Sequence, residues 1–218
     1  MATPTNRPGR TRIKVCGIRD SEALHAAVDA GADSIGLMFV ESSPRYVKPA
    51  DGFALMAELP PMVTAVGVIA DATVEQFLAI EEVCPTPIVQ LHGSETIETA
   101  RRCGPGVIKA IRFDPHTIRD DLAKWNEVEE VESILIDGSA GGEGVAFAWD
   151  ALAEAAHTIT TPIIVAGGLD PDNVGDAIRA CRPFAVDVSS GVERERGIKD
   201  PARIRAFCDA VRDADSHS

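Results

Sequence analysis

An eightfold alternation between short apolar runs and longer amphipathic segments constrains the fold of this chain more than any other feature. Such an alternation predicts βα units whose strands form a parallel sheet. Eight strict repeats of roughly 25 residues favour a closed barrel over an open doubly wound sheet. We therefore expect an α/β protein that folds as a single-domain (β/α)8 TIM barrel. The expected strands are Ile13–Cys16, Ser34–Phe39, Val63–Ile69, Ile88–Leu91, Val107–Arg112, Ser133–Asp137, Ile163–Ala166 and Phe184–Val188.

The segments between the apolar runs are typical of helices, because several begin at an acidic residue or a proline and end near glycine or proline. Linkers between the elements are short, so a second domain is not expected. We expect a flexible leader over residues 1–11, a barrel domain over 12–213 and a flexible tail over 214–218. The expected helices are Asp20–Ala30, Pro49–Glu58, Thr73–Val83, Ser94–Arg102, Pro115–Asn126, Trp149–Ala156, Pro171–Ala180 and Pro201–Val211.

The net charge and the cysteine content limit which partners and which cellular compartments are expected for this chain. The net charge of −13 argues against nucleic acid or an anionic membrane as a partner. No apolar run reaches the roughly 18 residues of a membrane span, and the first residues lack the apolar stretch of a secretory signal. The five cysteines are odd in number and lack C-x-x-C spacing, which argues against disulfides and zinc and favours the cytoplasm. No other cluster has metal-ligand spacing, so we expect no metal.

Two consecutive strands near the C-terminus each end in a turn of small residues. Gly167 and Gly168 follow the seventh expected strand, and Ser189 and Ser190 follow the eighth. Small residues allow backbone N–H groups to approach an anion closely, and a short helix after the serines would add its positive end. The two turns together predict one phosphate-binding cradle and hence a phosphorylated small molecule as the ligand.

Reactive groups stand at the carboxyl ends of other strands, where barrel enzymes carry their active sites. Cys16 ends the first strand and is either a buried structural thiol or a nucleophile or general base. Asp137 ends the sixth and is either a loop anchor or an acid whose pKa is raised by apolar walls. These two strands lie across a barrel mouth from each other, so the pair could hold a substrate from two sides.

Further polar residues are expected around the same mouth. Arg45, on the loop after the second strand, is either a solvated charge or a planar fork for a substrate carboxylate. Gln90 and His92 end the fourth strand, and His92 is either a pocket hydrogen-bonder or a structural histidine. Asp187 either binds a substrate hydroxyl or holds its own loop. The glycine-rich segment 138–144 is either a mobile lid or a plain connector.

Five motifs in a fixed order resemble the phosphoribosylanthranilate isomerase family of tryptophan biosynthesis, over about residues 12–212. The motifs are Lys14-Val15-Cys16-Gly17-Ile18, Gly36-Leu37-Met38-Phe39 with Ser43-Pro44-Arg45-Tyr46-Val47, Val89-Gln90-Leu91-His92-Gly93, Ala166-Gly167-Gly168-Leu169 with Asn173-Val174, and Asp187-Val188-Ser189-Ser190-Gly191-Val192-Glu193 with Gly197-Ile198-Lys199-Asp200.

The resemblance implies an Amadori rearrangement of N-(5-phosphoribosyl)anthranilate to the 1-deoxyribulose 5-phosphate product, without cofactor or metal. It implies that Cys16 is the general base, Asp137 the general acid and Arg45 the ligand of the anthranilate carboxylate. It assigns the phosphate to Gly167, Gly168, Ser189 and Ser190. The chain lacks the aspartate that the family often has just before the tryptophan at position 149, and its loop after the sixth strand is short, which bears on loop closure.

Two alternatives remain at this point. One is an isomerase that acts on the related aminoaldose of the histidine pathway, or on both that substrate and the anthranilate substrate. That family uses a pair of aspartates, whereas this chain has Cys16. The other is a non-catalytic sensor of phosphorylated ligands on a barrel scaffold. We expect a monomer or a homodimer.

Overall fold

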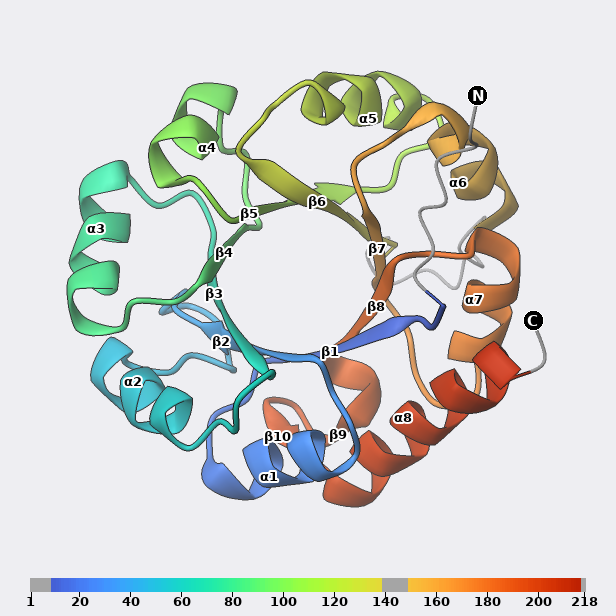
Figure 1. Cartoon of the computed structure of the whole chain (residues 1–218). Coiled ribbons are helices and arrows are strands. Elements are labelled where there is room, and N and C mark those ends of the chain that lie inside the picture. The colour runs from blue at the N-terminus through green and yellow to red at the C-terminus, as the bar shows by residue number, and fades with distance from the viewer. Residues whose placement is uncertain (1–8, 139–148, 217–218) are drawn as a thin grey trace.

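The protein is a closed barrel of eight parallel strands, which run around the barrel in sequence order from β1 to β8 (Figure 1). The structure is a computed structural model, and it describes residues 9–138 and 149–216. This closed ring confirms the predicted (β/α)8 architecture. The strands are β1 (Arg12–Cys16), β2 (Ser34–Met38), β3 (Thr64–Ile69), β4 (Ile88–Leu91), β5 (Val107–Arg112), β6 (Val131–Asp137), β7 (Ile163–Ala166) and β8 (Ala185–Val188).

Helices form an outer ring around the barrel (Figure 1). The α-helices are α1 (Ser21–Asp29), α2 (Pro49–Ala57), α3 (Val74–Val83), α4 (Ile97–Cys103), α5 (Ile118–Asn126), α6 (Trp149–Ala155), α7 (Val174–Cys181) and α8 (Pro201–Ser216). A 3-10 turn η1 (Ala156–Thr158) follows α6. Between β8 and α8 the chain forms a second 3-10 turn η2 (Ser190–Val192) and a small antiparallel hairpin of β9 (Glu193–Glu195) and β10 (Ile198–Lys199). This hairpin was not among the expected elements.

Every strand begins and ends within two residues of its expected position, because its apolar run is buried on both faces. Helix starts are less accurate: α4, α5 and α7 each begin three residues later than expected. In α5 and α7 the expected proline lies in a turn closed by an aspartate, since Asp114 accepts from the His116 N–H and Asp170 accepts from the Asp172 N–H. In α4 the cap is Thr96, whose hydroxyl accepts from the Thr99 N–H.

Helix α8 is longer than expected, and it changes the expected boundaries of the leader and the tail. It runs to Ser216, five residues beyond the expected end, so residues 214–216 are helical rather than a flexible tail. Asp215 accepts hydrogen bonds from the backbone N–H of Thr11 at 2.6 Å and from its hydroxyl at 2.8 Å. Thr11, expected in the leader, is 1% exposed. Residues 1–8 lie outside the described part of the chain.

Two apolar clusters stabilise the barrel. The larger cluster lies between the strands and the ring of helices. The smaller cluster consists of residues that alternate along the strands, such as Val66, Leu135 and Ala185, and lies inside the barrel. Toward the carboxyl ends of the strands the interior side chains become polar, with Lys14, Gln90 and Asp187 all buried. Within residues 9–138 and 149–216, no helix is both long and apolar enough to cross a membrane.

Candidate active site

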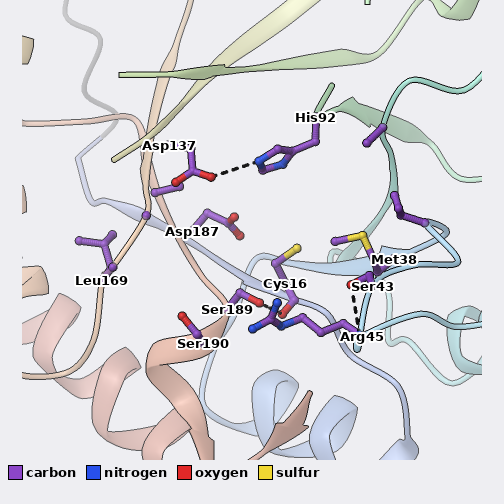
Figure 2. A pocket seen from close by; sticks show the side chains of 15 residues that line it. Cys16, Met38, Ser43, Arg45, His92, Asp137, Leu169, Asp187, Ser189 and Ser190 are labelled. Carbon is purple, nitrogen blue, oxygen red and sulfur yellow. Dashed lines mark hydrogen bonds and ion pairs between the residues drawn. The ribbon is translucent and has the colours of Figure 1, made fainter. Parts of the chain in front are cut away.

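A cavity of about 330 Å³ opens at the carboxyl ends of the strands (Figure 2). Its volume is typical of small-molecule sites. Nearly every site residue expected from the sequence lines it, which places the expected base, acid and anion-binding turns around one space. The expected residues that line it are Cys16, Arg45, His92, Asp137, Gly167, Gly168, Asp187, Ser189 and Ser190. Met38, Ser43 and Leu169 complete much of the wall, and sequence reasoning had not selected them.

Strand β1 places Cys16 on the cavity wall with only 4% of the residue exposed. The neighbouring strand carries Gly36 beside it, and a Cβ at that position would lie 2.8 Å from the Cys16 sulfur. A larger residue at position 36 would therefore displace the thiol. Burial raises the pKa of the Cys16 thiol above its ordinary value, Asp187 raises it further, and the ammonium groups of Lys14 and Lys199 act against them.

Lys14 is a site residue whose role sequence reasoning missed. It is 2% exposed, and its ammonium nitrogen lies 2.9 Å from Asp187 Oδ1 in a buried ion pair. Burial lowers the pKa of Lys14, but Asp187 and Cys16 outweigh that effect and raise the pKa overall. Side chains two apart on a strand point to the same face, so the sequence Lys14-Val15-Cys16 did contain the signal. The Asp187 carboxylate thus compensates a lysine beside the thiol.

Asp137 stands across the cavity from Cys16, with Asp187 between them in Figure 2. His92 Nε2 lies 3.2 Å from Asp137 Oδ2, and His92 Nδ1 lies 2.7 Å from Gln90 Nε2. The tautomer in which Gln90 donates to Nδ1 leaves the N–H on Nε2, directed at the carboxylate. Gln90 is fully buried and does not line the cavity, so its expected place in the pocket is wrong. It is instead in contact with the ring of His92, which does line the cavity.

The two predicted phosphate turns lie against each other. Gly167 and Gly168 have φ angles of +83° and +69°, a conformation that favours glycine. Ser189 donates its hydroxyl to the backbone carbonyl of Cys16 at 3.2 Å. A Cβ at Gly191 would lie 2.0 Å from the carbonyl oxygen of Leu169, so only glycine allows the two loops to approach this closely. Backbone contact therefore fixes the shape of the expected cradle and its distance from Cys16.

Arg45 reaches the cavity from the loop after β2, and its guanidinium lies beside Ser189 (Figure 2). Its side chain is 20% exposed, and Glu193 accepts from its Nε at 2.6 Å and from its Nη2 at 3.0 Å. Arg45 therefore does bind a carboxylate with two donors, as a planar fork would, but this carboxylate belongs to Glu193 of the same chain. Sequence reasoning could not find this pair, because 148 positions separate the two residues.

Two expectations for the loop after β6 lie outside the described residues. Of the segment 138–144, only Gly138 is described, so its interpretation as a lid stays a prediction. The missing aspartate before Trp149 falls in the same gap. Within the described part of the chain, no group of three or more His, Cys, Asp or Glu side chains is arranged to hold a metal ion.

A thiol and a carboxylate that flank a cavity, with turns suited to phosphate at its rim, define a (β/α)8 barrel enzyme of acid–base chemistry on a phosphorylated small molecule. The sequence model described as N-(5'-phosphoribosyl)anthranilate (PRA) isomerase matches residues 13–210. The chain belongs to this family, as the motifs had suggested.

Relatives and solved structures agree with the assignment. N-(5'-phosphoribosyl)anthranilate isomerase of Pseudomonas putida is 45% identical over 208 residues, covering 93% of this chain and 98% of the relative. The protein of the same name from Herminiimonas arsenicoxydans is 41% identical over 219 residues and covers 95% of each chain. The crystal structure of phosphoribosyl anthranilate isomerase from Thermotoga maritima has a TM-score of 0.83 at 36% identity, covering 93% of this chain and 99% of that one. Another similar structure, of the isomerase in complex with reduced 1-(o-carboxyphenylamino)-1-deoxyribulose 5-phosphate, has a TM-score of 0.81 at 36% identity, with the same coverage.

Proposed function

We propose that this chain is the phosphoribosylanthranilate isomerase of tryptophan biosynthesis and that Cys16 and Asp137 carry its acid–base chemistry. The observation that carries the proposal is the placement of these two side chains around one cavity whose rim is formed by Gly167, Gly168, Ser189 and Ser190. Family membership supports the reaction, since the relatives carry the name of this isomerase over nearly their full length.

Asp137 is the general acid in this mechanism. It protonates the ring oxygen of the phosphoribosyl group, the ring opens, and the nitrogen of the anthranilate becomes an iminium. His92 Nε2 lies 3.2 Å from Asp137 Oδ2 and holds the carboxyl group in place. Because Asp137 is partly exposed to the cavity, with 24% of its side chain accessible, it can exchange its proton with water after each turnover.

Cys16 is the general base. As a thiolate it removes the proton from C2 of the opened chain, and the enolamine that results tautomerises to the ketone. Burial raises the pKa of the resting thiol, so the thiolate forms mainly when positive charge is near. Lys14 supplies such a charge permanently, and the iminium supplies a second one at the step that needs the base. Acid and base catalysis each contribute about 10²–10⁴-fold.

The two anionic ends of the substrate hold the opened sugar between acid and base. The turns after β7 and β8 bind the phosphate through backbone N–H groups, and Arg45 binds the anthranilate carboxylate. Asp187 is paired with Lys14 and lines the cavity, which supports a role as acceptor of a hydrogen bond from a substrate hydroxyl. Fixing both ends of a flexible intermediate makes the proton transfers effectively intramolecular, which is a large part of the rate enhancement.

A fluorescence assay that follows the disappearance of the anthranilate substrate tests the proposal. Wild type is expected to turn over this substrate, whereas Cys16→Ser is expected to be inactive. The histidine-pathway aminoaldose, which carries phosphates at both ends, is the second substrate to assay. Turnover of the second substrate alone would refute the proposal, and ligand binding without turnover of either would indicate a sensor.

The remaining expectations concern location and assembly. All five cysteines are free thiols, which supports a reducing compartment, and we place the reaction in the cytoplasm. We expect a monomer or a homodimer that binds a small phosphorylated substrate. One similar structure is of generated monomers of a dimeric phosphoribosylanthranilate isomerase from Thermotoga maritima. Sedimentation of the purified chain distinguishes the two states.

A further inference from the structure

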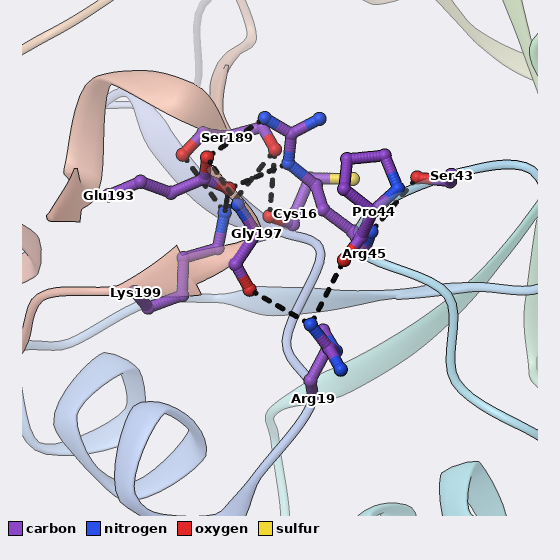
Figure 3. A network of polar contacts seen from close by, with 9 residues as sticks. All are labelled: Cys16, Arg19, Ser43, Pro44, Arg45, Ser189, Glu193, Gly197 and Lys199. Atoms are coloured by element: carbon purple, nitrogen blue, oxygen red, sulfur yellow. Dashed lines mark hydrogen bonds and ion pairs between the residues drawn. The ribbon is translucent and has the colours of Figure 1, made fainter. Parts of the chain in front are cut away.

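A buried cluster of charges contacts Arg45 and Ser189, two of the residues that line the cavity (Figure 3). Its centre is Glu193, whose side chain is 4% exposed at the start of β9. Glu193 accepts four hydrogen bonds: from Arg45 Nε at 2.6 Å, Arg45 Nη2 at 3.0 Å, Lys199 Nζ at 3.0 Å and the Gly197 N–H at 3.0 Å. A buried carboxylate with this many donors has its acceptor capacity filled. It is therefore held in a single position.

The contact with Glu193 determines which edge of Arg45 is available to a ligand. A guanidinium has five N–H donors, and Glu193 uses the Nε–H and one Nη2–H. The remaining edge, with both Nη1 hydrogens and one Nη2 hydrogen, can still take a carboxylate in bidentate fashion. Because Arg45 lines the cavity, this edge is the one offered to the substrate. Rotation of the guanidinium would break two charged hydrogen bonds.

Lys199 connects the same cluster to the phosphate turn. Lys199 is a buried residue, 5% exposed. Its ammonium group donates hydrogen bonds to the Ser189 carbonyl at 2.9 Å and to the Ser189 hydroxyl at 3.3 Å. Ser189 in turn donates to the Cys16 carbonyl at 3.2 Å. A continuous chain of hydrogen bonds thus runs from Arg45 through Glu193 and Lys199 to the serine turn and the catalytic strand.

Electrostatics and close packing keep this chain of contacts intact. Burial raises the pKa of Glu193, but Arg45, the Gly197 N–H and Lys199 outweigh it and lower the pKa to about 2, so the carboxylate stays charged near neutral pH. One carboxylate between two cations leaves a net charge of +1, which suits a bound anion. A Cβ at Gly197 would lie 2.5 Å from the Pro44 carbonyl, so the hairpin and the Arg45 loop are in direct contact.

We propose that Glu193 and Lys199 are positioning residues that join the carboxylate-binding Arg45 and the phosphate-binding serine turn into one rigid unit. This unit sets the separation between the two ends of a substrate that carries both anions. The inference rests on the proposed function, since it takes Arg45 and the serine turn as the two anion-binding groups.

Calorimetric titration of two ligands tests it. The first ligand is reduced 1-(o-carboxyphenylamino)-1-deoxyribulose 5-phosphate, which has both anionic ends, and the second is ribose 5-phosphate, which has only the phosphate. Glu193→Gln is expected to weaken the first by about 10-fold to 100-fold, the range for a lost hydrogen bond to a charged group. It is expected to change the second by less than about threefold. In turnover the loss should fall mainly on KM, because the carboxylate is bound equally before and during the reaction.

Three further variants complete the design. Glu193→Asp keeps the charge beside Lys199 but is too short for both Arg45 contacts, so it should show the same selective loss even where Glu193→Gln does not fold. Lys199→Met should weaken both ligands, because Lys199 also holds Ser189. Glu154→Gln removes an exposed carboxylate paired with Arg119 on the outer ring and should change neither affinity.

Equal affinity of wild type and both Glu193 variants for the two-ended ligand would overturn the inference and leave the proposed function standing. A parallel loss of both ligands in Glu193→Asp would overturn it as well, because a merely structural role predicts that result. A wild type that binds ribose 5-phosphate but not the two-ended ligand would overturn the proposed function itself, and the inference with it.

Discussion

Removal of the Lys14 charge should destabilise the protein strongly, and removal of both charges of its ion pair should not. Lys14→Met leaves the Asp187 carboxylate, 7% exposed, without its ammonium partner at 2.9 Å. An uncompensated buried charge costs about 3–5 kcal/mol, whereas replacement of both partners by neutral groups is often nearly neutral. Because Asp187 also lines the cavity and can take up water there, we expect about 3 kcal/mol for the single variant.

Urea unfolding followed by circular dichroism measures this difference. For a domain of this length, 3 kcal/mol corresponds to a fall in Tm of roughly 6–12 °C. Asp187→Asn should also destabilise the protein, because it leaves Lys14 unpaired, and the double variant Lys14→Met with Asp187→Asn should recover most of the loss. Removal of Lys14 should also move the pH at which Cys16 is alkylated by iodoacetamide upward, because Lys14 lowers the pKa of that thiol.

A double variant whose loss equals the sum of the two single losses, within about 0.5 kcal/mol, would refute the ion pair as a stabilising unit. An unchanged alkylation profile in Lys14→Met would refute the electrostatic link to Cys16. The background from the other four thiols is measured on Cys16→Ser, which should show none of the pH-dependent reaction assigned to that site.

Cys16→Ser and Asp137→Asn should each lower kcat by at least about 100-fold, the lower end of the contribution of one acid or base, with Tm changed by only a few degrees. Glu193 should stabilise the fold fully above about pH 4.5 and progressively less as the pH falls toward its folded pKa of about 2, because this pKa lies below the unfolded value. The free energies of unfolding at pH 3 and pH 6, measured with urea, should therefore differ more in wild type than in Glu193→Gln, by about 2 kcal/mol. Gly191→Ala should separate the two phosphate turns, because its Cβ would meet the Leu169 carbonyl, and should lower both ribose 5-phosphate affinity and stability, the latter by about 1–3 kcal/mol.

Matched variants separate these effects from general damage. Cys84→Ser changes a fully buried thiol that does not line the cavity and should retain turnover, so a similar loss in both cysteine variants would contradict the role of Cys16. Gly168→Ala adds a Cβ that meets nothing within 4 Å and should be tolerated better than Gly191→Ala despite its positive φ. A larger loss in Gly168→Ala would mean that the backbone conformation, rather than close approach, dominates this region.

Strand positions could be predicted from the sequence because burial on both faces leaves a continuous apolar run, as in β7, whose bounds match the structure. The starts of α5 and α7 could not, because Asp114 and Asp170 close turns that replace the first helical residues expected at the prolines. A proline is compatible with either conformation, so only the side-chain contacts decide between them.

The residues of the site also fall into two groups, those that the sequence pattern predicts and those that it does not. Cys16, Asp137 and the small-residue turns are tied to strand ends, and strand ends follow from the pattern. The partners of these groups do not follow from the pattern. Lys14 and Asp187, for example, are 173 positions apart in the chain and come into contact only when the barrel is closed. Gln90 shows the converse error, since a residue near a strand end can be fully buried inside the barrel without lining the cavity.

Burial of the lysines has a practical consequence. Three of the five, Lys14, Lys109 and Lys199, are at most 5% exposed, and each is held in an ion pair. Among the lysines, acylating reagents and amine-reactive supports therefore reach the exposed Lys48 and Lys124. Conjugation through lysine amines should therefore attach dyes or surfaces at few points and leave the three buried lysines unmodified.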